Sequence, residues 1–231
     1  MTDSTLILSV ETATLGGSVC VTRRGEELSV RAGSPAISHS NTLLRDIDET
    51  LKSANVRLQD VDLFACAAGP GSFTGLRIGI ATVKALAATL ERPLIGIPTL
   101  HAVAHAAGPS QATVALLPAG RGEVFAQLFS VSEQLDVNER DRPGHLSPQK
   151  LMERYGDLRD VVWTGPGVTA QADFLKSSGV EFQIAEQPPI LARHVAALAL
   201  RLYEAGNVQT PESLSAIYVR PSDAELKLEC R

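Results

Sequence analysis

The chain opens with short apolar runs separated by turns, and a helical pattern follows them. Residues 6–10, 18–21 and 28–32 are apolar runs divided by glycine-containing turns, which predicts an antiparallel strand meander. From Ser40 onward, apolar residues recur every three or four positions. That spacing is typical of an amphipathic helix, here expected over about residues 40–53.

An alternation of strand and helix then continues to about residue 100. Residues 61–68 form an apolar run that ends in a glycine–proline–glycine turn, which indicates a buried strand. The mostly apolar, proline-free residues 72–90 predict a long helix, and residues 93–97 predict another buried strand. This order of elements after a meander indicates an α/β layer structure.

The second half of the chain repeats this alternation more weakly. The charged residues 138–148 contain proline and glycine and are expected to form a surface loop. We predict two lobes, residues 1–106 and a smaller, more irregular lobe at 107–231, with the late helix packing back towards the first lobe. The elements expected here are strands at 113–117, 124–131 and 161–164, and helices at 149–155, 170–176 and about 190–205.

The composition is that of a globular protein. Hydrophobic residues make up 44% of the 231 residues, charged residues make up 20%, and the formal net charge is −5. A protein whose main role is to bind nucleic acid usually carries a net positive charge or a basic patch, and this acidic composition does not have that character. The three cysteines form no C-x-x-C pair, no signal-peptide pattern is visible, and prolines break the longest uncharged stretch, residues 93–120. We expect reduced thiols, with Cys20 and Cys66 buried, in a soluble, cytoplasmic protein without membrane contact.

The glycine-rich block at residues 69–77, GPGSFTGLR, is the strongest candidate in the sequence for a ligand-binding site. Glycines between a strand and a helix let the backbone approach a phosphate or carboxylate, and they place free amides at a helix N-terminus. The spacing is neither G-x-G-x-x-G nor that of a P-loop, which requires a lysine. The alternative is a tight turn in which Ser72 caps the helix.

Two further candidates concern acid and histidine side chains. Glu11 ends the first strand, where a carboxylate can face a metal in phosphate-handling folds or can cap a turn. His101 and His105 have the H-x-x-x-H spacing that would place both on one face of a helix, as metal ligands require. No third ligand adjoins them, so packing or surface roles are the alternative.

The helix expected at residues 72–90 is apolar on nearly all sides. Only Arg77 and Lys84 carry charge in its interior. Such a helix is covered on several sides, either by the helices at 40–53 and 191–205 or by another protein.

Several blocks together resemble the TsaB/YeaZ family, the dimerization subunit of the bacterial machinery that makes N6-threonylcarbamoyladenosine in tRNA. The resemblance covers essentially the whole chain, and the GPGSFTGLRIG block is the most specific part of it. The blocks, in the order of the family, are residues 6–21, His39-Ser40, 69–79, 93–100, 122–125 and 216–220.

This resemblance implies an actin-like ATPase (ASKHA) fold, an α/β fold with two RNase H-like lobes whose mixed sheets are flanked by helices. It also implies that the chain is not an enzyme but a noncatalytic scaffold for a catalytic, TsaD-like paralogue of the same fold. The paralogue would transfer threonylcarbamoyl to the tRNA adenosine beside the anticodon. A TsaE-like ATPase subunit would use ATP, and this chain would bind no cofactor tightly, contact tRNA only indirectly and form a homodimer when alone.

The resemblance places the partner interface on the two helices of the first lobe. That interface comprises Leu43, Leu44, Ile47, Leu51, Phe73, Leu76, Arg77, Ile80 and Lys84. A vestigial anion or nucleotide site at the glycine turn would comprise Glu11, Gly69, Gly71, Ser72, Thr74 and Gly75. No metal site is expected.

Three features depart from the family pattern. The first-strand acid, usually Asp, is Glu11, which weakens the case for a metal-linked phosphate role. Residues 117–121 read LPAGR where Asp-Ala-Arg is frequent. His101 and His105 lie two residues out of register with the metal-binding pair of the catalytic paralogue, so we interpret them as coincidental.

Two other functions remain open from the residues alone. The first is a self-sufficient ATPase or phosphotransferase of the actin-like fold, which would use Glu11 with the glycine turn. The second is a metallopeptidase built on His101 and His105, which would require tightly bound metal.

Overall fold

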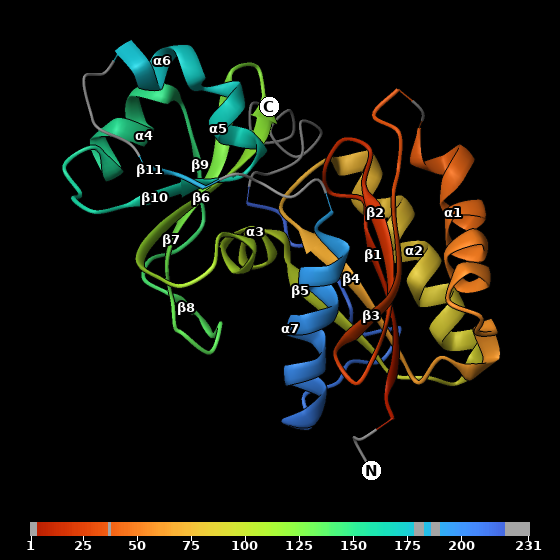
Figure 1. Ribbon diagram of the computed structural model, residues 1–231. Coiled ribbons are helices and arrows are strands. Elements are labelled where there is room, and N and C mark those ends of the chain that lie inside the picture. The colour runs from red at the N-terminus through yellow and green to blue at the C-terminus, as the bar shows by residue number, and fades with distance from the viewer. Residues whose placement is uncertain (1–3, 37, 178–182, 186–189, 220–231) are drawn as a thin grey trace. The chain divides into compact units, whose positions relative to one another are not determined.

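The computed structural model describes residues 4–36, 38–177, 183–185 and 190–219 (Figure 1). By its internal contacts the chain forms two compact units. The first unit is Met1–Ala102 with Pro188–Ala216, and the second is Val103–Gln187 with Ile217–Arg231. Residues 188–216 therefore belong to the first unit. The expected division at residue 106 had placed these residues in the second lobe.

The first unit is built on a mixed five-stranded sheet with the order β3-β2-β1-β4-β5. The strands β1 (Leu6–Glu11), β2 (Ser18–Arg23) and β3 (Glu26–Ala32) form the expected antiparallel meander. β4 (Leu63–Gly69) pairs in parallel with β1, and β5 (Leu94–Pro98) pairs in parallel with β4. Every residue of β1 and β4 is buried, as continuous apolar runs in a sheet covered on both faces require.

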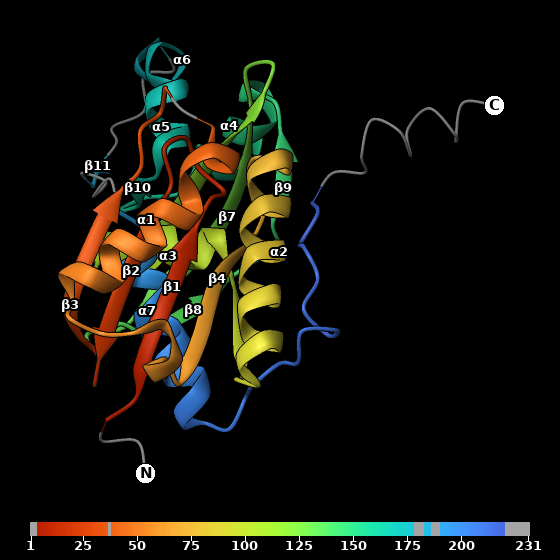
Figure 2. The ribbon, with the colours of Figure 1, turned by 90° about the vertical axis from the view of Figure 1, so that its right-hand side faces the viewer.

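Three helices cover this sheet. The helices α1 (His39–Ser53) and α2 (Phe73–Leu90) lie on one face, and α7 (Ala192–Glu204) lies on the other (Figures 1 and 2). The helices expected at 40–53, 72–90 and about 190–205 are therefore confirmed, and a short 3-10 helix, Leu58–Asp60, precedes β4. The helix α3 (Thr99–Ala107), which directly follows β5, was not predicted from the sequence.

The segment after α7 lies along the edge of this sheet. Leu94 and Gln209 exchange backbone hydrogen bonds of 3.3 and 2.9 Å, and the Gln209 side chain accepts a 2.8 Å bond from the Gly96 amide. Leu214 is buried, and its carbonyl oxygen accepts a 3.1 Å bond from Lys84 Nζ. The free edge of β5 is thus covered, which protects it from pairing with another chain.

The second unit contains a six-stranded sheet with the order β11-β10-β6-β7-β8, and β9 also pairs with β7. Trp163, Phe129 and Leu116 are among its fully buried side chains. The strands are β6 (Ser110–Gly120), β7 (Glu123–Val131), β8 (Val137–Glu139), β9 (Gly144–Leu146), β10 (Val162–Thr164) and β11 (Gln183–Ile184). The helices are α4 (Pro148–Tyr155), α5 (Pro166–Ala170) and α6 (Ala172–Ser177).

Two expectations for this unit were wrong in detail. The stretch 138–148 is not only a loop, because it contains part of β8 and all of β9, both paired with β7. The helix expected at 170–176 begins later, at Ala172, and the separate helix α5 precedes it.

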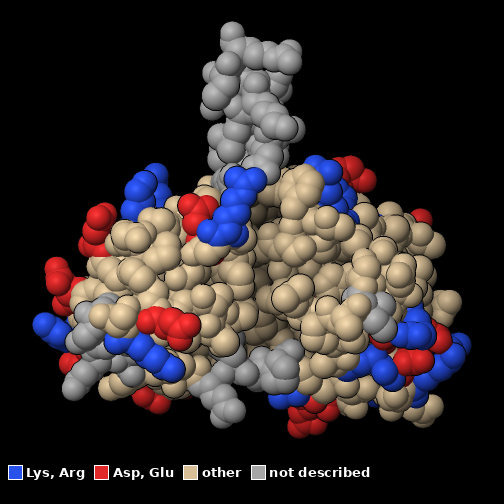
Figure 3. Space-filling model, turned by 90° about the horizontal axis from the view of Figure 1, so that it is seen from above, with Lys and Arg blue, Asp and Glu red and all other residues tan. Residues whose placement is uncertain are grey.

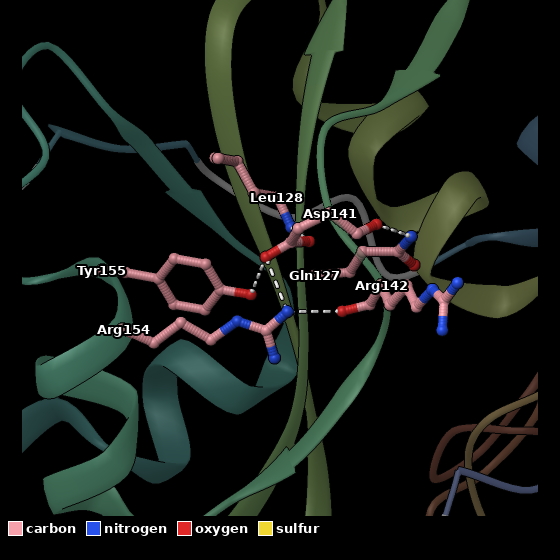
Figure 4. Close-up of polar contacts among 6 residues, drawn as sticks. All are labelled: Gln127, Leu128, Asp141, Arg142, Arg154 and Tyr155. Carbon is pink, nitrogen blue, oxygen red and sulfur yellow. Dashed lines mark hydrogen bonds and ion pairs between the residues drawn. The ribbon is translucent and has the colours of Figure 1, made fainter.

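The carboxylate of Asp141 holds the connection between β8 and β9 in place (Figure 4). It accepts hydrogen bonds of 2.8 Å from the Leu128 amide, from Arg154 and from the Tyr155 hydroxyl. Gln127 Nε2 donates a 2.9 Å bond to the Asp141 carbonyl oxygen. Burial, reinforced by the bond to Asp141, raises the pKa of Tyr155, so this hydroxyl remains a donor.

We expect Asp141→Asn to lower the free energy of unfolding by about 2–3 kcal/mol, because hydrogen bonds to a charged acceptor are lost. The NH₂ group of the new amide would also face the hydrogen-bond donors of Arg154 or Tyr155, an unfavourable contact between donors. Urea denaturation measures the change, and Asp157→Asn, at an exposed position in the same unit, is the control. Equal stability of the two variants would contradict the role assigned to Asp141.

Candidate functional site

Glu11 is the last residue of β1, and its side chain forms hydrogen bonds within the turn that follows. Its Oε1 atom accepts a 2.7 Å bond from the Thr14 amide, and its Oε2 atom accepts a 2.8 Å bond from the Thr14 hydroxyl. The residue is 1% exposed. Burial raises the pKa of the Glu11 carboxyl above its usual value, and the bonds from Thr14 oppose this shift only in part. Glu11 therefore acts as a turn cap.

Glu11→Gln is expected to make the free energy of unfolding less dependent on pH. With its pKa raised, Glu11 keeps a proton in the folded chain that the unfolded chain releases above about pH 4.5. Its stabilising contribution is therefore complete below that pH and is lost as the pH rises through the folded-state pKa. Denaturation between pH 4 and 8 tests this, and parallel pH profiles for the variant and the unchanged chain would contradict it.

A small pocket adjoins Glu11 between the ends of the strands and α1. Its polar lining includes Asp46, His39 and Arg31, and its volume of about 10 Å³ is room for roughly one water molecule. The pocket is too small for a phosphate group. Within the residues that the structure describes, no three His, Cys, Asp or Glu side chains gather as a metal site would require.

The glycine turn brings the start of α2 against the loop after β1. Ser72 caps α2, because its Oγ atom accepts a 3.2 Å bond from the Gly75 amide. A Cβ atom at Gly71 would lie 2.6 Å from Ala13, and one at Gly75 would collide with the carbonyl oxygen of Thr12. The glycines are thus needed for close packing, as in the capped tight turn weighed above. An anion role for Glu11, Gly69, Gly71, Ser72, Thr74 and Gly75 stays a prediction.

The structure divides the interface residues predicted on α1. Leu43, Ile47 and Leu51 are buried in the first unit, because their four-residue spacing faces them towards the sheet and α2. Leu44 is 68% exposed on the opposite side. The three buried residues belong to the core of the unit, and only Leu44 is available to another protein.

The same division holds on α2. Leu76 and Ile80 are buried, and Lys84 donates to a carbonyl oxygen of its own chain. Phe73 is 42% exposed, and the Arg77 guanidinium lies 3.8 Å from its ring centroid, a cation–π contact. Leu76 and Ile80 are therefore core residues, whereas Phe73 and Arg77 lie on the surface.

The exposed face of α2 is nonetheless largely apolar. An exposed stripe of it comprises Phe73, Arg77, Ala81, Ala85 and Ala88, which follow one another at helical spacing, and Thr74 and Thr89 are exposed beside this stripe. The helix has a mean hydropathy of 1.3 over 18 residues, and 33% of it is buried. By length and composition it would pass for a membrane span, but its other side packs on β4 and β1 within the sheet layer. This face of the first unit has the character of a protein-binding surface.

The two histidines of the H-x-x-x-H pair lie on α3. His105 is buried, and both residues interact with other groups of the chain. No third ligand joins them within the described part of the chain. Cys20 and Cys66 are free and buried, as expected, and burial raises the pKa of each thiol to about 12. Cys230 lies outside the described residues.

The turn at residues 12–17 was expected from the sequence, but the roles of Thr14 and Leu15 within it were not. Thr14 donates hydrogen bonds to both carboxylate oxygens of Glu11, and Leu15 beside it is almost fully exposed. The signal was present as an acid followed three residues later by threonine, a spacing that local turn caps use.

Comparisons with known proteins agree with this architecture. The sequence model of the tRNA N6-adenosine threonylcarbamoyltransferase (TsaD) family matches residues 34–154, which is more than half of the 231 residues. The TsaB protein of Escherichia coli K12 is 29% identical over 96% of this chain and 97% of its own length. The chain belongs to this family, and within it to the TsaB/YeaZ group.

Other relatives fit this placement. The TsaB protein of Haemophilus influenzae is 34% identical over 58% of each chain. YeaZ from Pseudomonas aeruginosa has the same fold, with a TM-score of 0.78, 24% identity, and coverage of 93% of this chain and 99% of that one. The expected fold, two mixed sheets flanked by helices, is confirmed. A threonylcarbamoyltransferase of Staphylococcus epidermidis is 36% identical, but it shares only 46% of this chain and 35% of its own length.

TsaB relatives are named for tRNA threonylcarbamoyladenosine biosynthesis, and the chain is accordingly part of that modification system. The relatives that are named as transferases match only a part of it.

Proposed function

We propose that this chain is a noncatalytic scaffold for a TsaD-like catalytic paralogue. That paralogue transfers threonylcarbamoyl to the tRNA adenosine beside the anticodon. The observation that carries the proposal is the exposed apolar face of α2, with Phe73, Ala81, Ala85 and Ala88. A face of this kind gains free energy only when another protein covers it.

The chemistry of this face fits a partner helix. Alanines at three- and four-residue spacing keep the helix surface shallow, so that a second helix can approach closely. The region 34–154 shared with the TsaD family contains both α1 and α2, so the paralogue is expected to carry equivalent helices. Like surfaces of two related chains can then pair about a pseudo-twofold axis.

A noncatalytic role accords with the state of Glu11. Both of its oxygens are bonded to Thr14, and it is buried, so it is poorly placed to hold a metal-bound nucleotide. We propose that ATP is used by a TsaE-like subunit and that this chain holds no cofactor tightly. The net charge of −5 fits an indirect contact with tRNA. We propose a cytoplasmic location and a homodimer in the absence of the paralogue.

Calorimetric titration of the chain into the purified TsaD-like paralogue tests the proposal. We expect a one-to-one complex in place of a homodimer, with a negative heat-capacity change because apolar surface is buried. Light scattering of each protein and of the mixture gives the stoichiometry. A chain that stays monomeric and fails to bind would overturn the proposal, and submicromolar binding and turnover of Mg-ATP by the isolated chain would favour the self-sufficient ATPase.

A further inference from the structure

The loop that joins β1 to β2 carries Leu15, which is 86% exposed, the largest value among the large apolar residues that the structure describes. Single exposed leucines are common on protein surfaces and alone carry no meaning. The distinguishing feature of Leu15 is the backbone that holds it, because this loop is fixed from several sides.

Thr14, the residue before Leu15, is held by two elements. Glu11 at the end of β1 accepts hydrogen bonds of 2.7 and 2.8 Å from the Thr14 amide and hydroxyl. The Nε2 atom of His39, the first residue of α1, lies 3.1 Å from the Thr14 carbonyl oxygen. The position of residue 14 is therefore set by the sheet and by α1 together.

Both flanks of the loop are fixed as well. The Ala13 carbonyl oxygen accepts a 2.8 Å bond from the amide of Ser72, the cap of α2. The Gly17 carbonyl oxygen accepts a 3.0 Å bond from the Gly33 amide just beyond β3. The loop is thus attached to the first residue of α1 and to the cap of α2, and Leu15 lies between these attachments.

This end of the first unit is poor in charge. Figure 3 looks onto the end where β1 finishes and where α1 and α2 begin, and the surface of this unit is largely uncharged there, with charges gathered at its rim. An uncharged centre surrounded by a charged rim is the usual arrangement of a protein–protein interface.

We propose that Leu15 is an anchor residue for the TsaD-like paralogue, and that Glu11 and Thr14 are the positioning residues that hold it ready. This inference rests on the proposed function and extends the α2 face by a loop that is continuous with the beginnings of both helices. A rigid anchor loses little conformational entropy on binding, so burial of its side chain contributes to affinity almost in full.

The occupant is the one proposed for the α2 face, because the 2.8 Å bond from the Ser72 amide to the Ala13 carbonyl oxygen joins this loop to the cap of α2. A second copy of this chain is the alternative occupant that the experiments below separate.

The first experiment measures the dissociation constant of the complex with the paralogue by calorimetry. We expect Leu15→Ala to raise it between about ten- and a hundredfold, the range for burying a leucine side chain, without changing the urea midpoint of the isolated chain. Leu202→Ala, on α7 at the other face of the sheet, is the matched control and should leave the dissociation constant unchanged.

The second experiment tests the positioning role with a double-mutant cycle. Thr14→Val removes the hydroxyl that bonds Glu11, so the loop loses a restraint. In that background the effect of Leu15→Ala should shrink to roughly threefold or less, whereas Thr14→Ser should keep the full effect. A purely structural role of Thr14 would leave the contribution of Leu15 unchanged.

The outcomes separate this inference from the proposed function. If Leu15→Ala leaves the dissociation constant unchanged while a charge on the α2 face abolishes binding, the proposed function stands and the anchor role is wrong. If Leu15→Ala weakens only the homodimer, the occupant is a second copy, and the inference is overturned. If the unchanged chain does not bind the paralogue at all, both are overturned.

Discussion

Gly75→Ala should lower the free energy of unfolding by about 3 kcal/mol or more, although alanine is the better helix former. Gly75 lies in the first turn of α2, and a Cβ atom there would collide with the Thr12 carbonyl oxygen. Thr12 also donates a 2.8 Å hydrogen bond to the Gly75 carbonyl oxygen, so the two segments cannot move apart cheaply. Without the close contact, helix propensity alone predicts a gain of about 1 kcal/mol.

Thermal or urea denaturation measures this change, with Thr74→Ala as the control. Thr74 is exposed in the same turn, so its variant should stay within about 0.5 kcal/mol of the unchanged chain. An equally stable Gly75→Ala variant would show that the glycine is not required for packing and would restore ligand binding as its explanation.

Ala85→Arg should abolish the complex with the TsaD-like paralogue, raising the dissociation constant about a hundredfold or more. Ala85 is exposed in the middle of the apolar face of α2. Inside a helix–helix contact, the arginine would lack room and would be buried without a partner charge, which is costly. In the isolated chain the same side chain remains in water, so the free energy of unfolding should change by less than about 0.5 kcal/mol.

Ala205→Arg is the matched control, because Ala205 is exposed at the end of α7 on the other face of the sheet. Its dissociation constant should equal that of the unchanged chain. If Ala85→Arg still bound the paralogue normally, the α2 face would not be the interface, whatever else the chain contacts.

Regular periodicity made most of the first unit predictable. The apolar runs before Glu11 and Gly69 and the four-residue spacing of Leu43, Ile47 and Leu51 each correspond to an element of the structure. These patterns reflect burial along a strand or on one helix face, which is a local property of the sequence.

The features that could not be predicted from the sequence are those that depend on which other element a side chain packs against. An apolar helix such as α2 offers no internal sign of which face the sheet covers, so Leu76 and Ile80 were expected at an interface although they lie in the core. Likewise the bonds of Asp141 reach residues 13 and 14 positions away, beyond any local pattern. Short strands such as β9 form through pairing rather than through a pattern of their own.

The most direct test of the scaffold role is tRNA modification by the reconstituted system. Purified paralogue, ATPase subunit and threonylcarbamoyl-adenylate-forming enzyme would be assayed for modified adenosine with this chain present, absent or replaced by its Ala85→Arg variant. We predict modification only with the unchanged chain. Equal modification in its absence, or threonylcarbamoyl transfer by this chain without the paralogue, would contradict the account.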